Sequence, residues 1–125
     1  ANPRNYLQKL IKYERLLDAE NSLSELGEFA AACVDSFEKA LPYGTYNLTN
    51  PGSVTTREVV ELIRKSGVCT RAFSFFDSEE EFLSKAAKTP RSNCVLDSTK
   101  ALRANLKLRP VLEAIEESLA NWVPA

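Results

Sequence analysis

The sequence predicts a small mixed domain of the α/β or α+β class, with about five helices and three or four short strands. Amphipathic helical patterns alternate with short runs of β-branched and aromatic residues, and the connections between them are short. No internal repeat, low-complexity tract or long linker interrupts the 125 residues, and this length suffices to bury one core. One compact unit over residues 1–125 is therefore expected.

Helix and strand signals alternate in the first third of the chain. Asn2 and Pro3 suit the N-cap and first position of a helix that ends near Tyr13, and a short strand follows over residues 15–18. Ser22 and Glu25 form a capping-box pattern ahead of the clearest helix in the sequence. The apolar residues of that helix have helical spacing and are expected to form its buried face: Leu26, Phe29, Ala30, Cys33, Phe37, Ala40 and Leu41. Pro42 and Gly44 should end it.

The middle of the chain predicts a strand, a turn and a helix. Thr45 to Leu48 has strand composition, and residues 49–52 are turn formers. Thr55 and Glu58 form a second capping box, so a helix should begin near Thr56, with Val59, Val60 and Ile63 on its inner face. The free N–H groups at such a helix start attract anions, but an ordinary strand-turn-helix connection is the favoured interpretation of the pattern.

The last third predicts one strand and three helices. Residues 70–76 have strand composition, and Ser78 with Glu81 forms a capping box for a short acidic helix. A polar loop over residues 88–93 precedes an apolar stretch, Cys94 to Leu96, and then a short helix near residues 100–104. Pro110 should open the final helix, with five residues on its buried side: Val111, Leu112, Ile115, Leu119 and Trp122.

Composition excludes several functional classes. A net charge of −1 gives no nucleic-acid signature, and no apolar run reaches the roughly 20 residues that span a bilayer. The chain has no histidine, and its three cysteines are widely spaced, so we expect reduced thiols, a cytoplasmic setting and no metal site. A Cys69–Cys94 disulfide is the less favoured alternative. The chain also has no methionine, even at its first position, and we expect it to be part of a longer protein.

The loop Thr89-Pro90-Arg91-Ser92-Asn93 carries the chemistry best suited to a ligand. Arg91 offers a planar fork of donors for phosphate oxygens, and Ser92 and Asn93 add short polar groups. The alternative is that Arg91 pairs with Asp97 or caps a helix. Tyr43, Tyr46 and Trp122 have the chemistry to stack on a base, but core packing is the favoured interpretation for lone aromatic residues. No pair of carboxylates has a spacing that indicates catalysis.

Three segments together resemble the C-terminal part of NAD(P)-dependent nucleotide-sugar epimerases, dehydratases and reductases, which are extended short-chain dehydrogenases. The segments are YNLTNPGSVTTREVVELI from Tyr46, AAKTPRSNCVLDSTK from Ala86 and RPVLEAIEESLANW from Arg109. The nearest members are dTDP-4-dehydrorhamnose reductases, the plant rhamnose-synthase reductase domains and bacterial proteins named dTDP-glucose 4,6-dehydratase. The resemblance extends from Asn21 onward and more weakly to the start.

This resemblance implies that residues 1–125 are a nucleotide-sugar-binding C-terminal domain whose partner is a Rossmann domain. In such enzymes the Rossmann domain holds NAD or NADP and carries the catalytic Tyr-x-x-x-Lys pair. The present sequence has neither that pair nor a glycine-rich turn, since its four glycines are scattered. We therefore expect no catalytic, cofactor-binding or metal-binding residue in this chain.

The same resemblance suggests six contacts to the nucleotide diphosphate-sugar: Arg91, Asn93 and Ser92, and more weakly Asn47, Thr49 and Asn50. Many relatives place an arginine before the long helix, whereas this chain has Asn21 and Ser22, and Ala101 replaces a bulky apolar residue. The function that the sequence predicts is substrate binding within a dTDP- or UDP-4-keto-deoxysugar reductase, epimerase or 4,6-dehydratase, not active alone and prone to self-association. The alternative is a non-catalytic protein-interaction module with the same fold.

Overall fold

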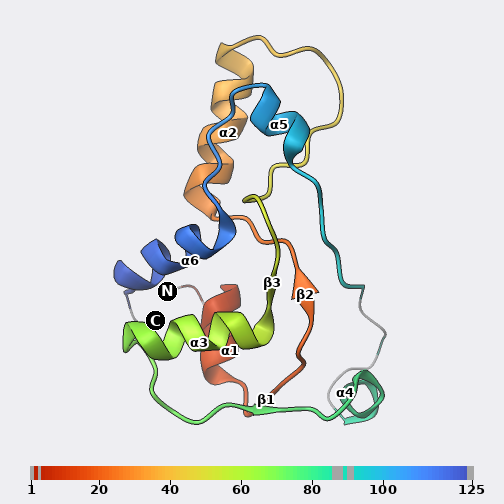
Figure 1. Cartoon of the computed structure of the whole chain (residues 1–125), viewed down its shortest axis with the longest axis vertical. Coiled ribbons are helices and arrows are strands. Elements are labelled where there is room, and N and C mark those ends of the chain that lie inside the picture. The colour runs from red at the N-terminus through yellow and green to blue at the C-terminus, as the bar shows by residue number, and fades with distance from the viewer. Residues whose placement is uncertain (1, 3, 86–88, 90–91, 124–125) are drawn as a thin grey trace.

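The computed structural model describes residues 2, 4–85, 89 and 92–123. It contains six helices and four two-residue strands in these regions. In chain order they are α1 (Tyr6–Lys12), β1 (Arg15–Leu16), β2 (Glu20–Asn21), α2 (Leu26–Glu38), β3 (Val54–Thr55), α3 (Thr56–Ser66), β4 (Ser74–Phe75), α4 (Glu79–Lys85), α5 (Thr99–Arg103) and α6 (Val111–Ala120) (Figure 1). This is a small mixed domain compatible with the α+β class.

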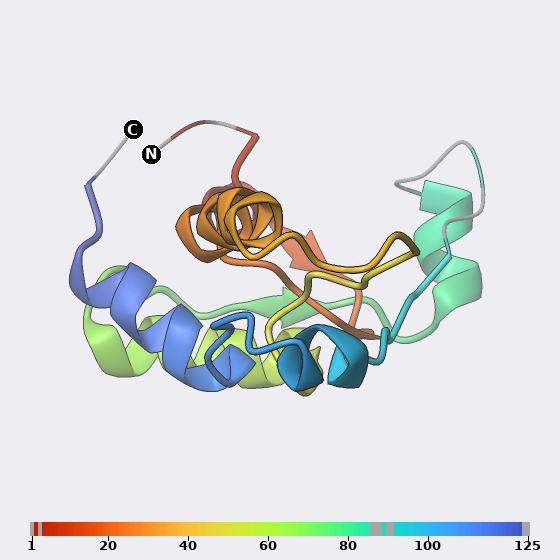
Figure 2. The ribbon, with the colours of Figure 1, turned by 90° about the horizontal axis from the view of Figure 1, so that it is seen from above.

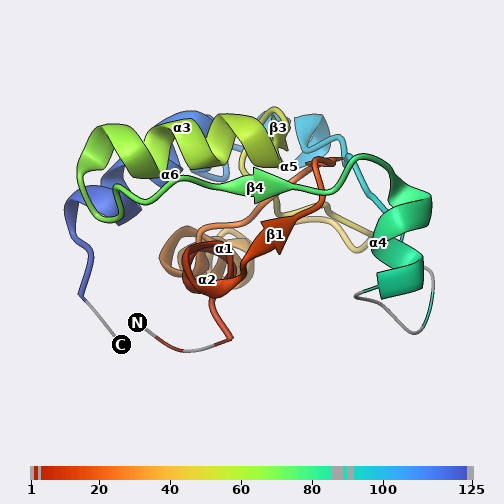
Figure 3. The ribbon, with the colours of Figure 1, turned by 90° about the horizontal axis from the view of Figure 1, so that it is seen from below.

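The strands form two separate two-stranded sheets. β1 pairs with β4 in parallel, with Arg15 opposite Ser74 and Leu16 opposite Phe75. β2 pairs with β3 in the antiparallel direction, with Glu20 opposite Thr55. Figure 3 shows β4 between α3 on one side and α1 with β1 on the other. These short sheets fix the connections, while the helices supply most of the buried surface.

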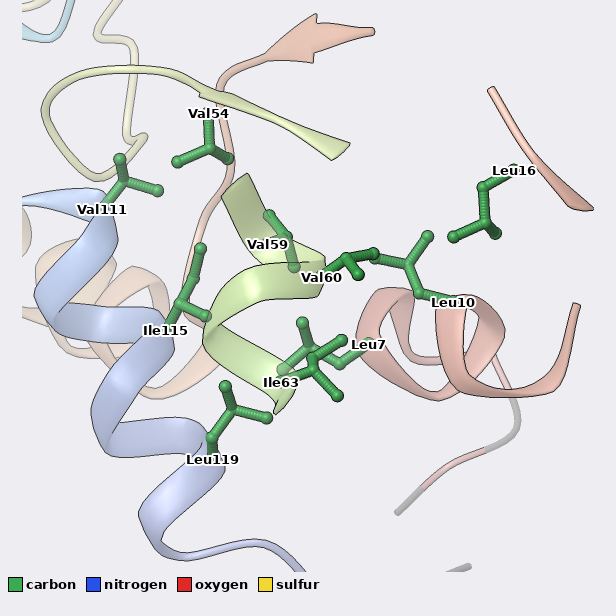
Figure 4. Packing of buried hydrophobic residues seen from close by; sticks show 10 residues of the cluster. All are labelled: Leu7, Leu10, Leu16, Val54, Val59, Val60, Ile63, Val111, Ile115 and Leu119. Carbon is green, nitrogen blue, oxygen red and sulfur yellow. The ribbon is translucent and has the colours of Figure 1, made fainter. Parts of the chain in front are cut away.

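The main core lies where α1, α3 and α6 meet. Val59 and Ile63 of α3 are fully buried, and Leu7, Ile115 and Leu119 point toward them from the two neighbouring helices (Figure 4). The complete buried set is Leu7, Leu10, Leu16, Val54, Val59, Val60, Ile63, Val111, Ile115 and Leu119. A second, smaller cluster joins Ala32 of α2 to Ala101, Leu106 and Leu108. The larger cluster packs α1, α3 and α6 together, and the smaller cluster packs α2 against residues 101–108.

The Thr55 capping box is confirmed. The Thr55 hydroxyl accepts the Glu58 N–H at 3.2 Å, and the Glu58 carboxylate accepts the Thr55 N–H at 3.0 Å. Gly67 ends α3 in the left-handed conformation, at φ 76°. This agrees with the general preference for glycine just beyond a helix C-terminus. The buried face of α3 is the one that the sequence predicts.

Two other helix starts differ from the prediction because a residue further along the chain supplies the capping side chain. α1 begins later than expected, with Asn5 rather than Asn2 as its N-cap, and the Asn5 side chain accepts the Leu7 N–H at 2.9 Å. Glu25 caps α2 through its own carboxylate, which accepts the N–H groups of Gly27 and Glu28. The predicted capping role of Ser22 is wrong, since its hydroxyl accepts the Leu96 N–H instead.

The predicted burial of the α2 face is also wrong for this chain. Of its residues only Ala32 is buried, whereas Leu26 is 77% exposed and Phe37 is 90% exposed. Pro110 stands at the N-cap of α6 rather than inside the helix, and Leu112 is exposed. The predicted strand over residues 45–48 does not form. Of the strand predicted over residues 70–76, only Ser74–Phe75 forms. Among the described residues, no helix is long and apolar enough to cross a membrane.

Candidate functional site

The segment Ser92–Asp97 contains two of the predicted ligand contacts, and side chains rather than a sheet hold it in place. The Asn21 carboxamide oxygen accepts the Cys94 N–H at 2.7 Å, and its nitrogen donates to Oδ1 of Asn93 at 3.3 Å. The Ser22 N–H donates to the Cys94 carbonyl at 2.8 Å, and the Ser22 hydroxyl accepts the Leu96 N–H at 2.7 Å. Because Asn21 ends β2 and Ser22 follows it directly, the short β2–β3 pair positions this segment.

Asn47 holds the other end of the same segment. Its side-chain nitrogen donates to the Asp97 carbonyl at 2.9 Å. The Asp97 carboxylate then accepts the Thr99 N–H at 2.8 Å at the start of α5, and these bonds from Thr99 lower the pKa of Asp97. The structure thus joins the asparagine-containing bend to the segment that follows the predicted ligand loop. Arg91 itself lies outside the described residues, as do Pro90 and Ala86 of the segments that carry the family resemblance.

Ser92 and Asn93 line a cleft of about 260 Å³. Its other walls come from α1, the β1 region and α4, and include Tyr6, Arg15 and Phe82. Ser92 and Asn93 are exposed to solvent at its edge. Hydroxyl and amide groups on an exposed rim are suited to donate hydrogen bonds to an anionic ligand.

Charges near this cleft already have partners. Arg15 forms an ion pair with Glu81 at 2.7 Å, and Lys85 pairs with the same carboxylate at 3.1 Å. The hydrogen bond from the Asp77 N–H, followed by those from Arg15 and Lys85, lowers the pKa of Glu81 to about 2. Arg15 also stacks on the Phe76 ring, 4.5 Å from its centroid. Glu81 therefore neutralises much of the positive charge that these two cations would offer to a phosphate.

Tyr6 lies on another wall of this cleft, and its pKa is shifted. Burial raises the pKa of its phenol, and the Asp18 carboxylate acts in the same direction, whereas a hydrogen bond with Thr56 opposes them. The neutral phenol therefore persists over a wider pH range than in a solvated tyrosine. In this state it is a hydrogen-bond donor rather than a base.

Thr49 and Asn50, the two other predicted contacts, are buried. The Asn50 nitrogen donates to Glu28 at 2.8 Å and to the Arg109 carbonyl at 2.9 Å, while its oxygen accepts the Glu25 N–H at 2.8 Å. All three hydrogen bonds are made within the domain, and they join the start of α2 to Arg109, which precedes α6. The Thr49 hydroxyl is buried without a hydrogen-bond partner among the described residues.

Asn50 also lies at the edge of a larger cleft of about 490 Å³, between α1, the start of α2, and α6. Arg109 crosses this region and pairs with Glu28 at 3.1 Å and with Glu117. Burial alone would raise the pKa of Glu28, but hydrogen bonds from the Arg109 N–H, the Asn50 amide and the Arg109 side chain outweigh it and lower that pKa. The walls are otherwise largely apolar and include Leu26, Ile115 and Trp122.

The three aromatic residues for which core packing is the favoured interpretation take different positions. Tyr46 packs against the smaller core cluster, and the Lys100 ammonium lies over its ring at 4.4 Å. Trp122 is half-buried against the main core, and Tyr43 is exposed. No cluster of three potential metal-ligating side chains occurs in the described ranges. The sequence did not predict the anchoring role of Asn21 and Ser22, and the available signal was two consecutive polar residues, the second of which follows β2.

Comparison with known proteins identifies relatives of the whole region. No protein-family model matches the chain. It is 36% identical over 123 residues to a bifunctional dTDP-4-dehydrorhamnose 3,5-epimerase/dTDP-4-dehydrorhamnose reductase of Arabidopsis thaliana, covering 98% of this chain and 38% of the relative. It is 31% identical over 121 residues to a trifunctional UDP-glucose 4,6-dehydratase/UDP-4-keto-6-deoxy-D-glucose 3,5-epimerase/UDP-4-keto-L-rhamnose-reductase of the same plant, covering 97% of this chain and 17% of the relative.

A solved structure agrees. The crystal structure of a UDP-rhamnose synthase from Acanthamoeba polyphaga mimivirus matches with a TM-score of 0.87 and 28% identity, over 98% of this chain and 42% of that one. The chain spans less than half the length of each of these proteins. It is therefore homologous to one region of the nucleotide-sugar enzymes of rhamnose synthesis.

Proposed function

We propose that this chain is the substrate-binding C-terminal lobe of an NAD(P)-dependent nucleotide-sugar oxidoreductase of the extended short-chain dehydrogenase type. The substrate would be a dTDP- or UDP-linked 4-keto-deoxysugar, and the parent reaction a reduction, epimerisation or dehydration. The observation that carries this proposal is the similarity along 98% of the chain to an enzyme named for epimerase and reductase activities. NAD or NADP, bound by the remaining part of the enzyme, would supply the hydride chemistry.

The residues of this chain would bind and orient the substrate. In this proposal the Arg91 guanidinium neutralises diphosphate charge, and Ser92 and Asn93 donate to its oxygens. Asn21, Ser22 and Asn47 hold the Ser92–Asp97 segment before any ligand arrives. A preformed segment loses less conformational entropy on binding than a free loop, so these anchors favour affinity. Orientation of the sugar beside the nicotinamide would then follow from the fixed diphosphate.

The test is a titration of the isolated chain with UDP and dTDP, followed through backbone amide NMR shifts. Shifts confined to residues 92–97 are expected, with a Kd on the order of 1 mM because only one wall of the site is present. Arg91→Ala should weaken binding about tenfold, since a charge-assisted hydrogen bond contributes roughly 1.5–3 kcal/mol. Arg57→Ala is the matched control, because Arg57 pairs with Asp18 on the surface and does not line the cleft.

An unchanged spectrum, or equal weakening by both substitutions, would contradict a diphosphate site at this segment. The reading frame that encodes the chain gives an independent check. A glycine-rich βαβ segment and a Tyr-x-x-x-Lys motif in the same frame are expected. If both are missing and no diphosphate binds, the protein-interaction alternative replaces the proposal.

A further inference from the structure

The helix α4 forms one wall of the cleft of about 260 Å³ but contributes nothing to the core. None of its residues is buried, and Figures 1 and 2 show it apart from α3 and α6. Its contacts with the preceding strands include the Arg15–Glu81 ion pair at 2.7 Å and an edge-to-face contact between Phe76 and Phe82, with ring centroids 5.3 Å apart. Because ion pairs at a protein surface add little to the free energy of unfolding, this pair has a further role open to it at the cleft.

Arg15 of β1 lines the same cleft as Ser92 and Asn93. One face of its guanidinium lies over the Phe76 ring, 4.5 Å from the centroid, and Nη2 donates to Oε1 of Glu81. Its Nε and Nη1 groups donate to none of the described residues. Arginine carries five N–H donors in a planar fork that matches phosphate oxygens. Arg15 therefore has the chemistry and the position to bind an anion in this cleft, and the Phe76 ring keeps it at the wall.

Glu81 is the group that competes with such an anion for Arg15. Its carboxylate also accepts the Asp77 N–H at 3.0 Å and pairs with Lys85 at 3.1 Å. Two donors would therefore remain on Glu81 if the Arg15 guanidinium turned toward a ligand. The exchange of partners leaves no carboxylate unpaired, so it avoids the cost of an unsatisfied charged group.

We propose that the Arg15–Glu81 ion pair is an autoinhibitory contact, in which Glu81 withholds Arg15 from the diphosphate of a nucleotide bound in this cleft. This inference rests on the proposed function. With Arg15 engaged, the ligand meets Ser92 and Asn93 at the rim of the cleft. A carboxylate close to a bound diphosphate also repels it. Glu81 therefore limits the affinity of the cleft for nucleotides, and a limited affinity favours rapid release of a nucleotide-sugar product.

The experiment titrates the chain and its Glu81→Gln variant with UDP and follows backbone amide NMR shifts. Glutamine keeps the size of glutamate and an oxygen that accepts hydrogen bonds, so the change removes the charge and leaves the shape. The Kd for UDP should fall about fivefold at low ionic strength, because one charge-assisted hydrogen bond is gained and one like charge is lost. In about 0.5 M salt the gain should shrink to less than about twofold, since salt screens exposed charges.

Two further variants show whether the effect acts through Arg15. Glu80→Gln removes the same charge from α4, but Glu80 does not line the cleft and forms no ion pair with a described residue. It should change the Kd by less than about 1.5-fold, because exposed charges at a greater distance are screened. When Arg15 is replaced by glutamine, the additional Glu81→Gln change should tighten binding by less than about twofold, since no guanidinium remains to be released.

The outcomes separate this inference from the proposed function. If Glu81→Gln leaves the Kd unchanged or raises it, while Arg91→Ala weakens UDP binding, the autoinhibitory contact is wrong and the proposed function stands. If Glu80→Gln tightens binding as much as Glu81→Gln, the net charge of α4 sets the affinity and the inference is overturned. If neither the parent chain nor the Glu81→Gln variant binds UDP, both proposals fail.

Discussion

Asn50 is the buried polar side chain whose loss should cost this fold the most. It is 1% exposed and makes three hydrogen bonds, to the Glu25 N–H, the Glu28 carboxylate and the Arg109 carbonyl. Asn50→Ala removes all three and leaves buried partners unsatisfied. At about 1 kcal/mol for each bond, the free energy of unfolding should fall by about 3 kcal/mol. That is a large fraction of the 5–15 kcal/mol typical of a domain.

Urea denaturation of the isolated chain measures this loss, and Trp122, the single tryptophan, supplies the fluorescence signal. The midpoint should move down by about 2 M for a slope near 1.5 kcal/mol per molar. Asn47→Ala is the matched control, because Asn47 makes one side-chain hydrogen bond, to the Asp97 carbonyl, and is only half-buried. It should lose about 1 kcal/mol. Equal losses from the two substitutions would refute the argument that the Asn50 network ties α2 to α6.

Asn50→Asp separates hydrogen bonding from charge at the same position. The new carboxylate can still accept the Glu25 N–H, but it faces Glu28 and a carbonyl oxygen. Repulsion raises the pKa of the new group in the folded state, so its neutral form is tolerated and its charged form is not. Stability should therefore be higher at pH 4 than at pH 7 relative to the parent chain, and should fall as pH rises through that folded pKa. A loss independent of pH would contradict the geometry.

Three further predictions concern the remaining structure. Asn21→Ala should accelerate hydrogen exchange at the Cys94 amide, which it leaves without an acceptor, and NMR exchange that is unchanged would show that Asn21 does not hold the segment. Thr55→Ala should destabilise the chain by about 1–2 kcal/mol in urea, because one half of the capping box is lost. The lowered pKa of Glu81 means that its contribution to stability is complete above about pH 4.5 and is lost as pH falls toward about 2. In urea denaturation followed by circular dichroism, the helix signal should therefore be lost at a lower urea concentration in acid than at neutral pH. Glu81→Gln should abolish that part of the pH dependence.

Local sequence patterns correctly predicted the features of α3 that depend on residues close together in the chain. The Thr55–Glu58 capping box and the buried face of α3 both form as expected. The capping box requires only groups within a few residues of one another. The overall mixed class follows from the same elements.

Predictions failed where distant polar groups compete. The Ser22 and Glu25 pattern is a capping box by spacing, but Leu96 donates to the Ser22 hydroxyl and Asn50 accepts the Glu25 N–H. Both partners are more than twenty residues away along the chain, so no local pattern contains them. The role of Asn21 and Ser22 in holding Ser92–Asp97 was missed for the same reason. The proposed ligand contacts Arg91, Ser92 and Asn93 remain predictions.

The disagreement at α2 has another origin. A hydrophobic pattern records the surfaces that a segment buries in the assembled protein, whereas exposure in one chain records only the surfaces buried within it. Pattern and burial agree at Val59 and Ile63 of α3 and at Ile115 of α6, yet they disagree at Phe37. An error in the periodicity itself would misassign faces throughout the domain. The disagreement is instead concentrated on α2, where Leu26 and Phe37 are exposed, with one further case at Leu112 of α6.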